Sequence, residues 1–515
     1  MTFIPERMTP LKARRLGLDT QQELTIYLRA DSAVCKSEGF AALSRVLVRT
    51  ESQHIIATLN IITSELLRPG EIGLSESAWQ RLGVKDGDSI WASHPTPVAS
   101  ISNIRAKVYG HSLTQDQYSE IIEDIVAGRY ADVHLAAFIT ACGNDNMNDQ
   151  EITYLTEAMV NSGSKISWDL PLVLDKHCVG GLPGNRTTPI VVSILAASGL
   201  TVPKTSSRAI TSPAGTADTM EALTNVSLSL DEMKKVVCEH GGCLAWGGSV
   251  RLSPADDLLI KVERVLDIDS EGQLIASVLS KKIAAGATHV LIDMPVGPTA
   301  KVRSQAAADK LAASFREVAK SLGLTIDIIF SDGRQPVGYG IGPALEARDI
   351  MAVLQNNANA PADLRERSIT VAGAMLEMAT DLPKGEGINQ AKQLIDSGQA
   401  WEKFRHICEA QGGMREPPIA PYRFELIAHQ HGWLSSVDNR RLSQVAKLAG
   451  APADLAAGVE IHVKLGEEVH PNTPLITIHA ESAGELNYAV EYLEAYPETV
   501  QICADKEQLN ERVTD

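Results

Sequence analysis

Apolar and polar residues alternate along the first 95 residues of the chain, in segments such as LTIYLRA, ALSRVLVRT and HIIATLNII. Because successive side chains of a strand point to opposite faces, this alternation predicts strands that are buried on one side. Turn sequences such as VKDGDS lie between these segments. We therefore expect residues 1–95 to form a small β-rich domain, followed by a proline-containing linker at residues 94–101.

After this linker the apolar residues recur three and four positions apart. This spacing is typical of helices with one buried face. It predicts a helical domain over residues 102–168, with helices in the segments 114–130, 132–143 and 148–163.

Short apolar runs and helical patterns then alternate. PLVLDKH, HVLIDMPVG and TIDIIFSDG are typical of buried strands, whereas TPIVVSILAASG and ADKLAASFREVAKSLG are typical of helices. This order predicts a mixed α/β domain over residues 169–416, with ligand-binding loops at the strand ends. Residues 417–515 are expected to form an α+β domain, because GVEIHVKLGEEVHPNTPLITIHA alternates and is rich in turns. The predicted fold class is α/β multidomain.

The composition limits which ligands and which cellular compartment we expect for this protein. The chain has 515 residues, with 47 basic and 64 acidic side chains and 4% aromatic residues, so we expect no surface for a nucleic acid polymer. Seven scattered cysteines without metal-ligand spacing predict a reduced, cytoplasmic protein with no metal site, and Cys238 and Cys243 are expected in the core. The N-terminus has no signal-peptide pattern, and the longest apolar run is too short for a bilayer, so we expect no membrane association.

A glycine-rich turn, DKHCVGGLPGN, leads directly into an apolar helix. Glycines allow the backbone to turn sharply and to approach a ligand, and the N–H groups that begin a helix favour an anion. The alternative is a tight strand-to-helix connection that binds nothing. Basic side chains and hydroxyls at the same turn favour phosphate binding; the residues concerned are Gly180, Gly181, Gly184, Lys176, Arg186, Thr187 and Thr188.

A second segment of this kind, PKTSSRAITSPAGTADTMEAL, covers residues 203–223. It offers hydroxyl donors, one arginine and a glycine turn before a helix, and two such loops can face one anion. Thr216 and Asp218 have an alternative role as caps of the following helix.

These motifs together resemble the thymidine phosphorylase family. The resemblance rests on DKH followed by Gly-Gly, the SSR-to-GT loop, the ASVLSKK helix and the GVEIHVKLGEEV segment, and it covers nearly the whole chain. GLPGNRTTPIVV and KTSSRAITSPAGTAD are most similar to the AMP phosphorylase branch, which also has the N-terminal β domain. The resemblance implies a homodimer and a central domain of nucleoside-phosphorylase/phosphoribosyltransferase type, with the active site between the helical and α/β domains.

The resemblance also implies phosphorolysis, in which inorganic phosphate attacks the anomeric carbon and releases the base and a sugar 1-phosphate. No metal or redox cofactor is implied, because phosphate is a co-substrate. The favoured substrate is a nucleoside 5′-monophosphate of the AMP, CMP or UMP type, which would give ribose 1,5-bisphosphate. The alternatives are phosphorolysis of thymidine or another pyrimidine nucleoside, and a non-catalytic nucleotide sensor. An anthranilate-type phosphoribosyltransferase would need an acidic motif for magnesium, which is not found in the glycine loops.

The family match assigns three sets of site residues. The phosphate-binding set is Lys176, Cys178, Thr188, Ser206 and Thr216. The substrate-binding set is Gly181, Ser207, Arg208, Ala209, Ile210, Thr211, Ser212, Ser277 and Lys301, of which Ser207, Arg208, Thr211, Ser212 and Lys301 are expected to hold a 5′-phosphate. The catalytic set is Asp269 as proton donor to the base and Lys281 near the base. His177 is added as a second-rank candidate because it is next to Lys176, and not from the family match.

Several of these residues have alternative roles. Asp269 could be a solvated carboxylate at a strand end, Lys281 and Lys282 could lie on an exposed helix end, and His177 could be packed under the loop. Two positions depart from the family. Cys178 stands where many members have serine, and a thiol is a weaker donor to phosphate. Val262 stands where thymidine-specific members have an arginine that grips the pyrimidine.

Overall fold

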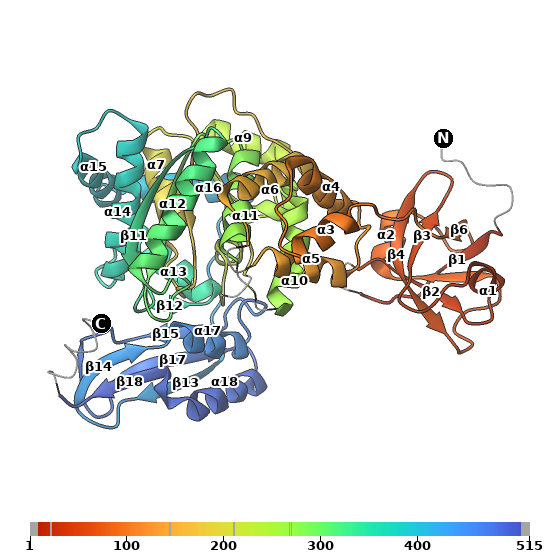
Figure 1. Ribbon diagram of the computed structural model, residues 1–515. Helices are drawn as coiled ribbons and strands as arrows, with labels where there is room; N and C mark the ends of the chain where they lie inside the picture. The colour runs from red at the N-terminus through yellow and green to blue at the C-terminus, as the bar shows by residue number, and fades with distance from the viewer. Residues whose placement is uncertain are drawn as a thin grey trace. The chain divides into compact units, whose positions relative to one another are not determined.

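The computed structural model describes residues 9–20, 23–143, 146–209, 212–266, 268 and 270–505. The chain divides into two compact units, Met1–Met147 with Lys261–Ser270, and Asn148–Ile260 with Glu271–Asp515. Figure 1 shows both, and the predicted α/β multidomain fold is confirmed. Among the helices that the structure describes, none is both long and apolar enough to cross a membrane.

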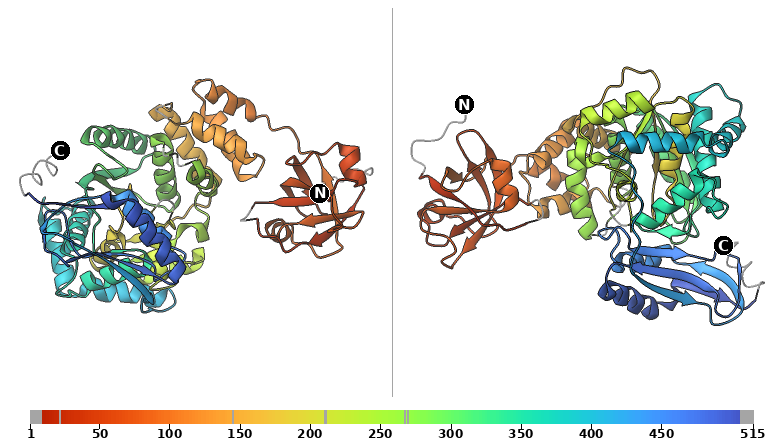
Figure 2. Two further views of the ribbon diagram at one scale, coloured as in Figure 1. Left: turned by 90° about the horizontal axis from the view of Figure 1, so that it is seen from below. Right: turned by 180° about the vertical axis from the view of Figure 1, so that it is seen from behind.

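The first unit begins with a closed six-stranded barrel (Figure 2). In β4, the side chains of Ile55, Ala57 and Leu59 are buried and alternate with more exposed ones, which explains the alternating sequence pattern. Two short helices, α1 and α2, accompany the barrel. The elements are β1 (Leu11–Arg15), β2 (Thr25–Arg29), α1 (Ala33–Glu38), β3 (Arg45–Arg49), β4 (His54–Ile62), β5 (Glu71–Leu74), α2 (Glu76–Leu82) and β6 (Ser89–Ser93).

Helices follow the barrel, as predicted. In α4, Tyr118, Ile121, Ile122 and Ile125 form the buried face, and Thr114 caps the first turn. The next helices also fall inside the predicted segments. The elements are α3 (Ile101–Val108), α4 (Gln115–Val126), α5 (Asp132–Ala141) and α6 (Asp149–Ser162), of which α6 belongs to the second unit.

Two sets of parallel strands form the centre of the second unit. Strands β11, β10 and β7 pair in that order, and β8 pairs with β9. The backbone N–H of Leu174, the first residue of β7, donates to the carbonyl of Thr201 just before β8, so β7 and β8 begin side by side. The strands are β7 (Leu174–Cys178), β8 (Val202–Ser206), β9 (Gly242–Trp246), β10 (His289–Val296) and β11 (Thr325–Asp332).

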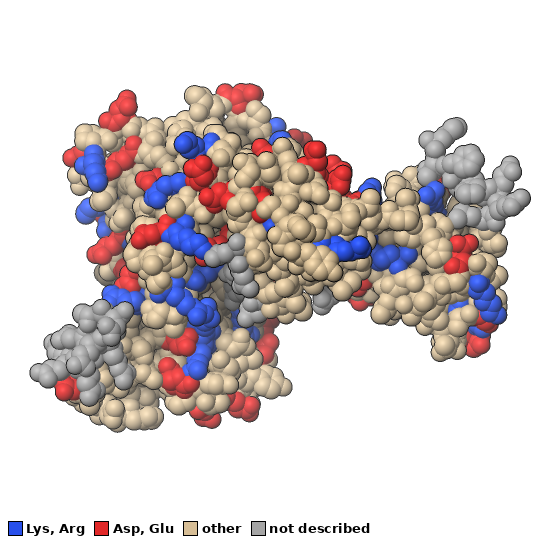
Figure 3. All heavy atoms as spheres, in the orientation of Figure 1, with Lys and Arg blue, Asp and Glu red and all other residues tan. Residues whose placement is uncertain are grey.

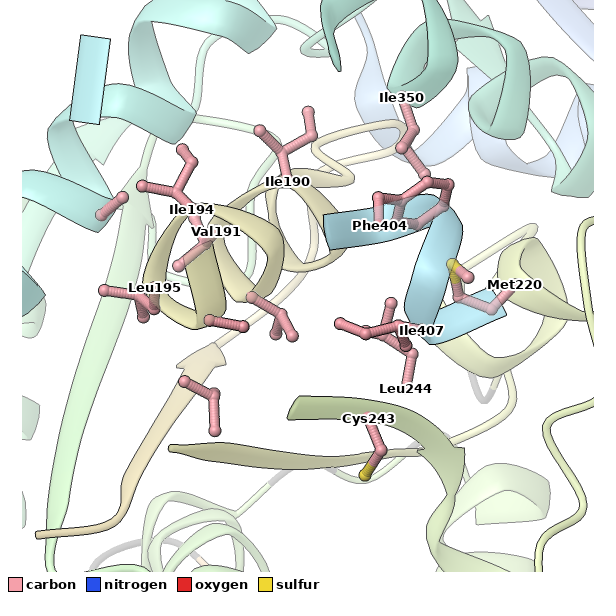
Figure 4. Packing of buried hydrophobic residues seen from close by; sticks show 14 of the residues in the cluster. Ile190, Val191, Ile194, Leu195, Met220, Cys243, Leu244, Ile350, Phe404 and Ile407 are labelled. Atoms are coloured by element: carbon pink, nitrogen blue, oxygen red, sulfur yellow. The ribbon is translucent and has the colours of Figure 1, made fainter. Parts of the chain in front are cut away.

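Helix α7 is buried along almost its whole length. Figure 4 shows Ile190 and Ile194 of this helix in the cluster that also contains Phe404 and Ile407. This central position explains why its sequence is mostly apolar on all sides rather than amphipathic. The helices of this part are α7 (Thr187–Ala197), α8 (Thr216–Glu221), α9 (Leu230–His240), α10 (Pro254–Leu266), α11 (Glu271–Ala284), α12 (Gln305–Ser321), α13 (Pro343–Leu354), α14 (Ala362–Ala379), α15 (Glu386–Asp396) and α16 (Gln399–Ala410).

The C-terminal part contains two small sheets, with orders β12-β15-β17-β13 and β16-β14-β18. Their apolar faces pack with α17 and α18 around one core cluster. The elements are β12 (Gly340–Ile341), β13 (Tyr422–Ile427), β14 (Gly432–Val437), α17 (Asn439–Leu448), β15 (Gly458–Ile461), β16 (Glu468–Val469), β17 (Pro474–Ala480), α18 (Ala483–Ala495) and β18 (Val500–Cys503).

One prediction about the core is half wrong. Cys243 is fully buried in β9, but Cys238 is exposed. Cys238 lies on α9 at a position that points away from the buried residues Met233, Val236 and Val237. The face of the helix therefore decides its exposure, not the residue type. On the face drawn in Figure 3, both acidic and basic side chains are visible over the second unit.

Candidate active site

The first glycine loop joins the end of β7 to the start of α7, and Lys176 lies beneath it. The Lys176 side chain is 1% exposed, and its Nζ donates to Thr187 Oγ1 at 2.7 Å. Thr188 Oγ1 is 3.4 Å from the same nitrogen. The ammonium group and the first residues of α7 thus meet at one point. An anion there would find a cation, hydroxyls and the positive end of a helix dipole.

Close backbone contacts explain the glycines of this loop. Gly181 and Gly184 have φ angles of 76° and 68°, in the left-handed region. A Cβ on Gly184 would lie 2.2 Å from the carbonyl oxygen of Val337, and a Cβ on Gly181 would lie 2.3 Å from the backbone nitrogen of Lys301. The second contact places Lys301 directly beside the first loop, although 120 residues separate it from Gly181 in sequence.

The second loop lies between β8 and α8. Ser206 ends β8, and its Oγ is buried without a hydrogen-bond partner among the described residues. Thr216 begins α8, and its Oγ1 accepts a hydrogen bond from Arg186 at 3.0 Å, so the hydroxyl hydrogen can be donated to a ligand. Asp218 caps the loop by accepting from the backbone N–H groups of Ala209 and Gly215. The capping role considered for Asp218 is therefore confirmed.

Arg186 connects the two loops. Its Nε donates to Glu346 Oε2 at 2.7 Å, and its Nη2 donates to the carbonyl of Ala214 at 2.9 Å. Glu346 is 1% exposed, and burial raises the pKa of its carboxyl although Arg186 opposes that shift. Because a partly buried arginine with three partners is fixed in place, Arg186 orders the loops rather than providing a mobile cation.

A charged layer lies under the loops. The buried carboxylate of Asp175 contacts Lys204 Nζ at 3.1 Å and Lys282 Nζ at 2.8 Å. Burial favours a raised pKa for Asp175, but the two lysines outweigh it and the pKa is lowered. Burial lowers the pKa of the Lys282 ammonium to about 7, against the opposing effect of Asp175. The alternative of an exposed position is therefore wrong for Lys282.

His177 and Cys178 complete the end of β7. Burial, followed by the surrounding lysines, lowers the pKa of His177 well below its ordinary value, so this partly buried ring is neutral. Asn185 Nδ2 donates to Cys178 Sγ at 3.3 Å. Burial raises the pKa of the Cys178 thiol to about 11, so the side chain is uncharged at neutral pH.

Ser277 and Lys281 lie one turn apart on α11 and therefore on one face of it. Lys281 Nζ forms an ion pair with the buried carboxylate of Asp256 on α10. Three predicted site residues, Asp269, Ile210 and Thr211, lie outside the described residues.

Arg208 was expected to hold a 5′-phosphate, but acidic side chains already surround it. Its guanidinium group forms two hydrogen bonds with Glu221, and Nη1 also contacts Asp218 Oδ1 at 3.2 Å. The guanidinium carbon lies 4.9 Å from the ring centre of Trp246. Ser212 Oγ donates to the carbonyl of Ala214 at 2.9 Å.

Sequence reasoning missed the carboxylates of this region. Asp293 is fully buried on β10, accepts from Ser331 Oγ at 2.6 Å, and has its Oδ2 4.0 Å from Lys176 Nζ. Asp175 precedes Lys176, and Glu346 follows a glycine turn on α13. A carboxylate inside an apolar run such as HVLIDMPVG is the signal that could have drawn attention to Asp293, because lone buried carboxylates are rare.

Three family profiles match the chain. "Glycosyl transferase family, helical bundle domain" matches residues 102–163, "Glycosyl transferase family, a/b domain" matches residues 170–401, and "Pyrimidine nucleoside phosphorylase C-terminal domain" matches residues 433–498. The chain is also similar to proteins named "Putative thymidine phosphorylase". The one from Polaromonas sp. strain JS666 is 55% identical over 500 residues, which cover 97% of this chain and 98% of the relative. The one from Legionella pneumophila strain Philadelphia 1 is 55% identical over 493 residues, 95% of each chain.

A solved structure shares part of the fold. Anthranilate phosphoribosyltransferase from Thermus thermophilus superposes with a TM-score of 0.51 at 19% sequence identity. The match covers 60% of this chain and 98% of that one. At this identity the similarity concerns the fold alone.

Proposed function

This chain belongs to the thymidine phosphorylase family and is a pentosyltransferase of the nucleoside phosphorylase type, and we propose that it cleaves the N-glycosidic bond of a pyrimidine nucleoside with inorganic phosphate. The observation that carries the proposal is a pair of contacts: Lys176 Nζ donates to Thr187 at the start of α7, and the preceding residue, Arg186, donates to Thr216 in the second loop. The names of the relatives support the choice of a pyrimidine nucleoside.

The two loops would hold and orient the phosphate nucleophile. Lys176 supplies the cation, while Thr188, Ser206 and Thr216 supply hydroxyl donors. A phosphate oxygen forms the new bond to C1′ of the sugar as the bond from C1′ to the base nitrogen breaks, and the electron pair of the broken bond goes to the base. Fixing a dianion in line with C1′ lowers the entropy cost of this step. No step in this scheme needs a metal or a redox cofactor.

The leaving base would face α11. Ser277 and Lys281 share one face of this helix, which suits hydrogen bonding to a pyrimidine carbonyl and to the negative charge that develops on the base. Asp269 is the proposed proton donor to the base. Asp256 would position Lys281 through their ion pair.

A nucleoside 5′-monophosphate is the second candidate substrate. It is favoured by Lys301, whose backbone packs on Gly181 beside the first loop, and by the hydroxyl of Ser207 in the second loop. Arg208 argues against a monophosphate substrate. Its guanidinium group already pairs with Glu221 and Asp218, so a 5′-phosphate would have to compete with two carboxylates for it.

A chromatographic screen tests the proposal. Base release is measured from thymidine, uridine and cytidine and from AMP, CMP and UMP, each with and without phosphate. We expect release only with phosphate, and faster from a pyrimidine nucleoside than from any monophosphate. If a monophosphate is cleaved fastest, the second candidate is correct. If nucleotides bind without any release of base, the protein is a sensor and both proposals fail.

Family membership supports a proposal about assembly, and the scattered cysteines support a proposal about location. We expect a homodimer, which light scattering of the purified chain can measure, and a cytoplasmic protein, which fractionation can test.

A further inference from the structure

Two histidines and a glutamate lie together in the C-terminal part, and none of them is among the residues assigned to phosphorolysis. Strands β14 and β16 are antiparallel, with Gly432 opposite Val469 and Trp433 opposite Glu468. His431 directly precedes β14 and His470 directly follows β16, so continuing this register by one residue brings them opposite each other. Because side chains two residues apart share a face of a strand, Glu468 and His470 lie beside each other and face His431.

The ligand atoms of these three side chains converge. His431 Nε2 is 2.7 Å from Glu468 Oε1. The rings of His431 and His470 are stacked, with centroids 5.1 Å apart. One nitrogen or oxygen atom from each of the three residues lies within 4.8 Å of the others.

We propose that His431, Glu468 and His470 bind Zn²⁺. Two imidazole nitrogens and one carboxylate oxygen are a donor set that suits zinc, whereas Ca²⁺ and Mg²⁺ prefer oxygen atoms alone. In a tetrahedral zinc site the ligand atoms are about 3.4 Å apart, as follows from bonds of about 2.0–2.1 Å. All three side chains are exposed, so small rotations bring them to this spacing, and water can fill the fourth position.

The bound ion would connect β16 to the segment that precedes β14. Strand β16 has only two residues, and its described pairing with β14 covers two positions. A ligand pair across the strands would therefore strengthen a short ladder. None of the three residues belongs to the phosphate-binding, substrate-binding or catalytic set. Zinc should therefore raise the stability of the C-terminal part without being required for the reaction.

Calorimetric titration tests the proposal, with ZnCl₂ added to the full chain after chelator treatment and dialysis. The wild type and His54→Ala, which removes an exposed histidine of the barrel, should each bind one more equivalent of zinc than the double variant His431→Ala/His470→Ala. Glu468→Gln keeps the shape of the side chain and should weaken binding about tenfold or more, as loss of a ligand exceeds the effect of losing an outer partner. Equal stoichiometry and affinity in all four proteins would overturn the proposal, and so would an unchanged affinity of Glu468→Gln alone.

Trp433 provides a second readout. Its ring packs edge-on against His431, with centroids 5.2 Å apart. Co²⁺ bound at the site should quench part of the tryptophan fluorescence, and this fraction should disappear in Trp433→Phe and in the double variant. Quenching that persists in the double variant would place the ion elsewhere. Zinc should also raise the thermal midpoint of the wild type more than that of the double variant. These readouts do not depend on phosphorolysis.

Discussion

Two regions of the second unit were expected to bind anions. The first is the end of β7 with the glycine loop that follows it, and its basic residue is Lys176; the second is the loop between β8 and α8, and its basic residue is Arg208. The side chains around these two basic residues differ. Lys176 donates to the hydroxyl of Thr187, and the Oδ2 atom of Asp293 is 4.0 Å from its nitrogen, beyond hydrogen-bond distance. Arg208, by contrast, forms two hydrogen bonds with Glu221 and a further contact with Asp218. Lys176 thus has one carboxylate at the outer limit of an ion pair, whereas Arg208 bonds directly to two carboxylates.

The difference shows that a basic residue next to a glycine turn is not by itself evidence for a phosphate contact. Both residues occupy similar sequence contexts, with small hydroxyl residues before a helix. The two residues differ in the carboxylates near them. Arg208 is paired with Glu221, which lies at the C-terminal end of α8. A charge-assisted hydrogen bond contributes about 1.5–3 kcal/mol, so an arginine that keeps such partners gains little by turning to a new anion.

The largest effect is expected for Lys176→Met. This change removes the cation beneath the first loop, whose nitrogen also lies 4.0 Å from the buried carboxylate of Asp293. We expect the specificity constant for phosphate to fall by about 100-fold or more. Phosphate titrations at saturating nucleoside measure it.

Lys235→Met is the matched control, because Lys235 is an exposed lysine of α9 in the same unit. It should leave the phosphate titration unchanged. A normal phosphate response of a folded Lys176→Met protein would show that the anion binds elsewhere.

A smaller effect is expected for Glu221→Gln, which tests the second region. Loss of this carboxylate frees part of the Arg208 guanidinium group. If the loop faces the 5′ position, cleavage of UMP relative to uridine should rise by up to about tenfold. Glu402→Gln, which breaks a comparable exposed pair with Arg405, should not change the ratio. An unchanged ratio in Glu221→Gln would mean that Arg208 has no access to the 5′ position.

The sequence predicted the elements whose pattern is local. The alternation in β4 and the spacing of Tyr118, Ile121 and Ile125 in α4 reflect which side of one element is buried, and both predictions are confirmed. The turn glycines also follow from local geometry, since Gly181 and Gly184 need positive φ angles.

Partners that are distant in sequence could not be predicted in this way. Arg186 was expected to add positive charge for a phosphate, but Glu346 lies 160 residues further along the chain and holds it. Lys282 looked like a surface residue on a helix end, yet the fold places it against Asp175. Such pairings depend on which helix packs over which strand, and the pattern of a single segment carries no information on that.

The charged layer beneath the loops predicts a pH dependence of stability. The pKa of Lys282 is about 7 in the folded protein, whereas an unfolded chain holds a lysine proton up to about pH 10.4. Between these values the unfolded state binds more protons, so the free energy of unfolding should rise with pH from 7 to 10. In Lys282→Met this rise should be smaller. Thermal midpoints of both proteins at several pH values test it, and parallel pH profiles would show that Lys282 keeps its proton when buried.

The smallest effect is expected at Cys178. Comparing it with Lys176 separates the proposed role of a charged residue that binds phosphate from that of a neutral residue that would only line the site. Because burial raises its pKa to about 11, this side chain stays a neutral thiol at pH 8 and neither repels nor strongly attracts a dianion. Cys178→Ser provides a better donor in nearly the same volume, so the phosphate titration should be unchanged or improved by a few-fold at most. Cys178→Ala loses the acceptor for Asn185 and should weaken phosphate use only mildly.

Chemical labelling gives a second test of the Cys178 thiol. At pH 8 iodoacetamide should label the exposed Cys238 before Cys178, and mass spectrometry of the digested protein can follow the order of labelling. Two results would contradict this account: labelling of Cys178 before Cys238, or a loss of phosphate use in Cys178→Ala as large as that in Lys176→Met. Either would show that the thiol takes part in the reaction.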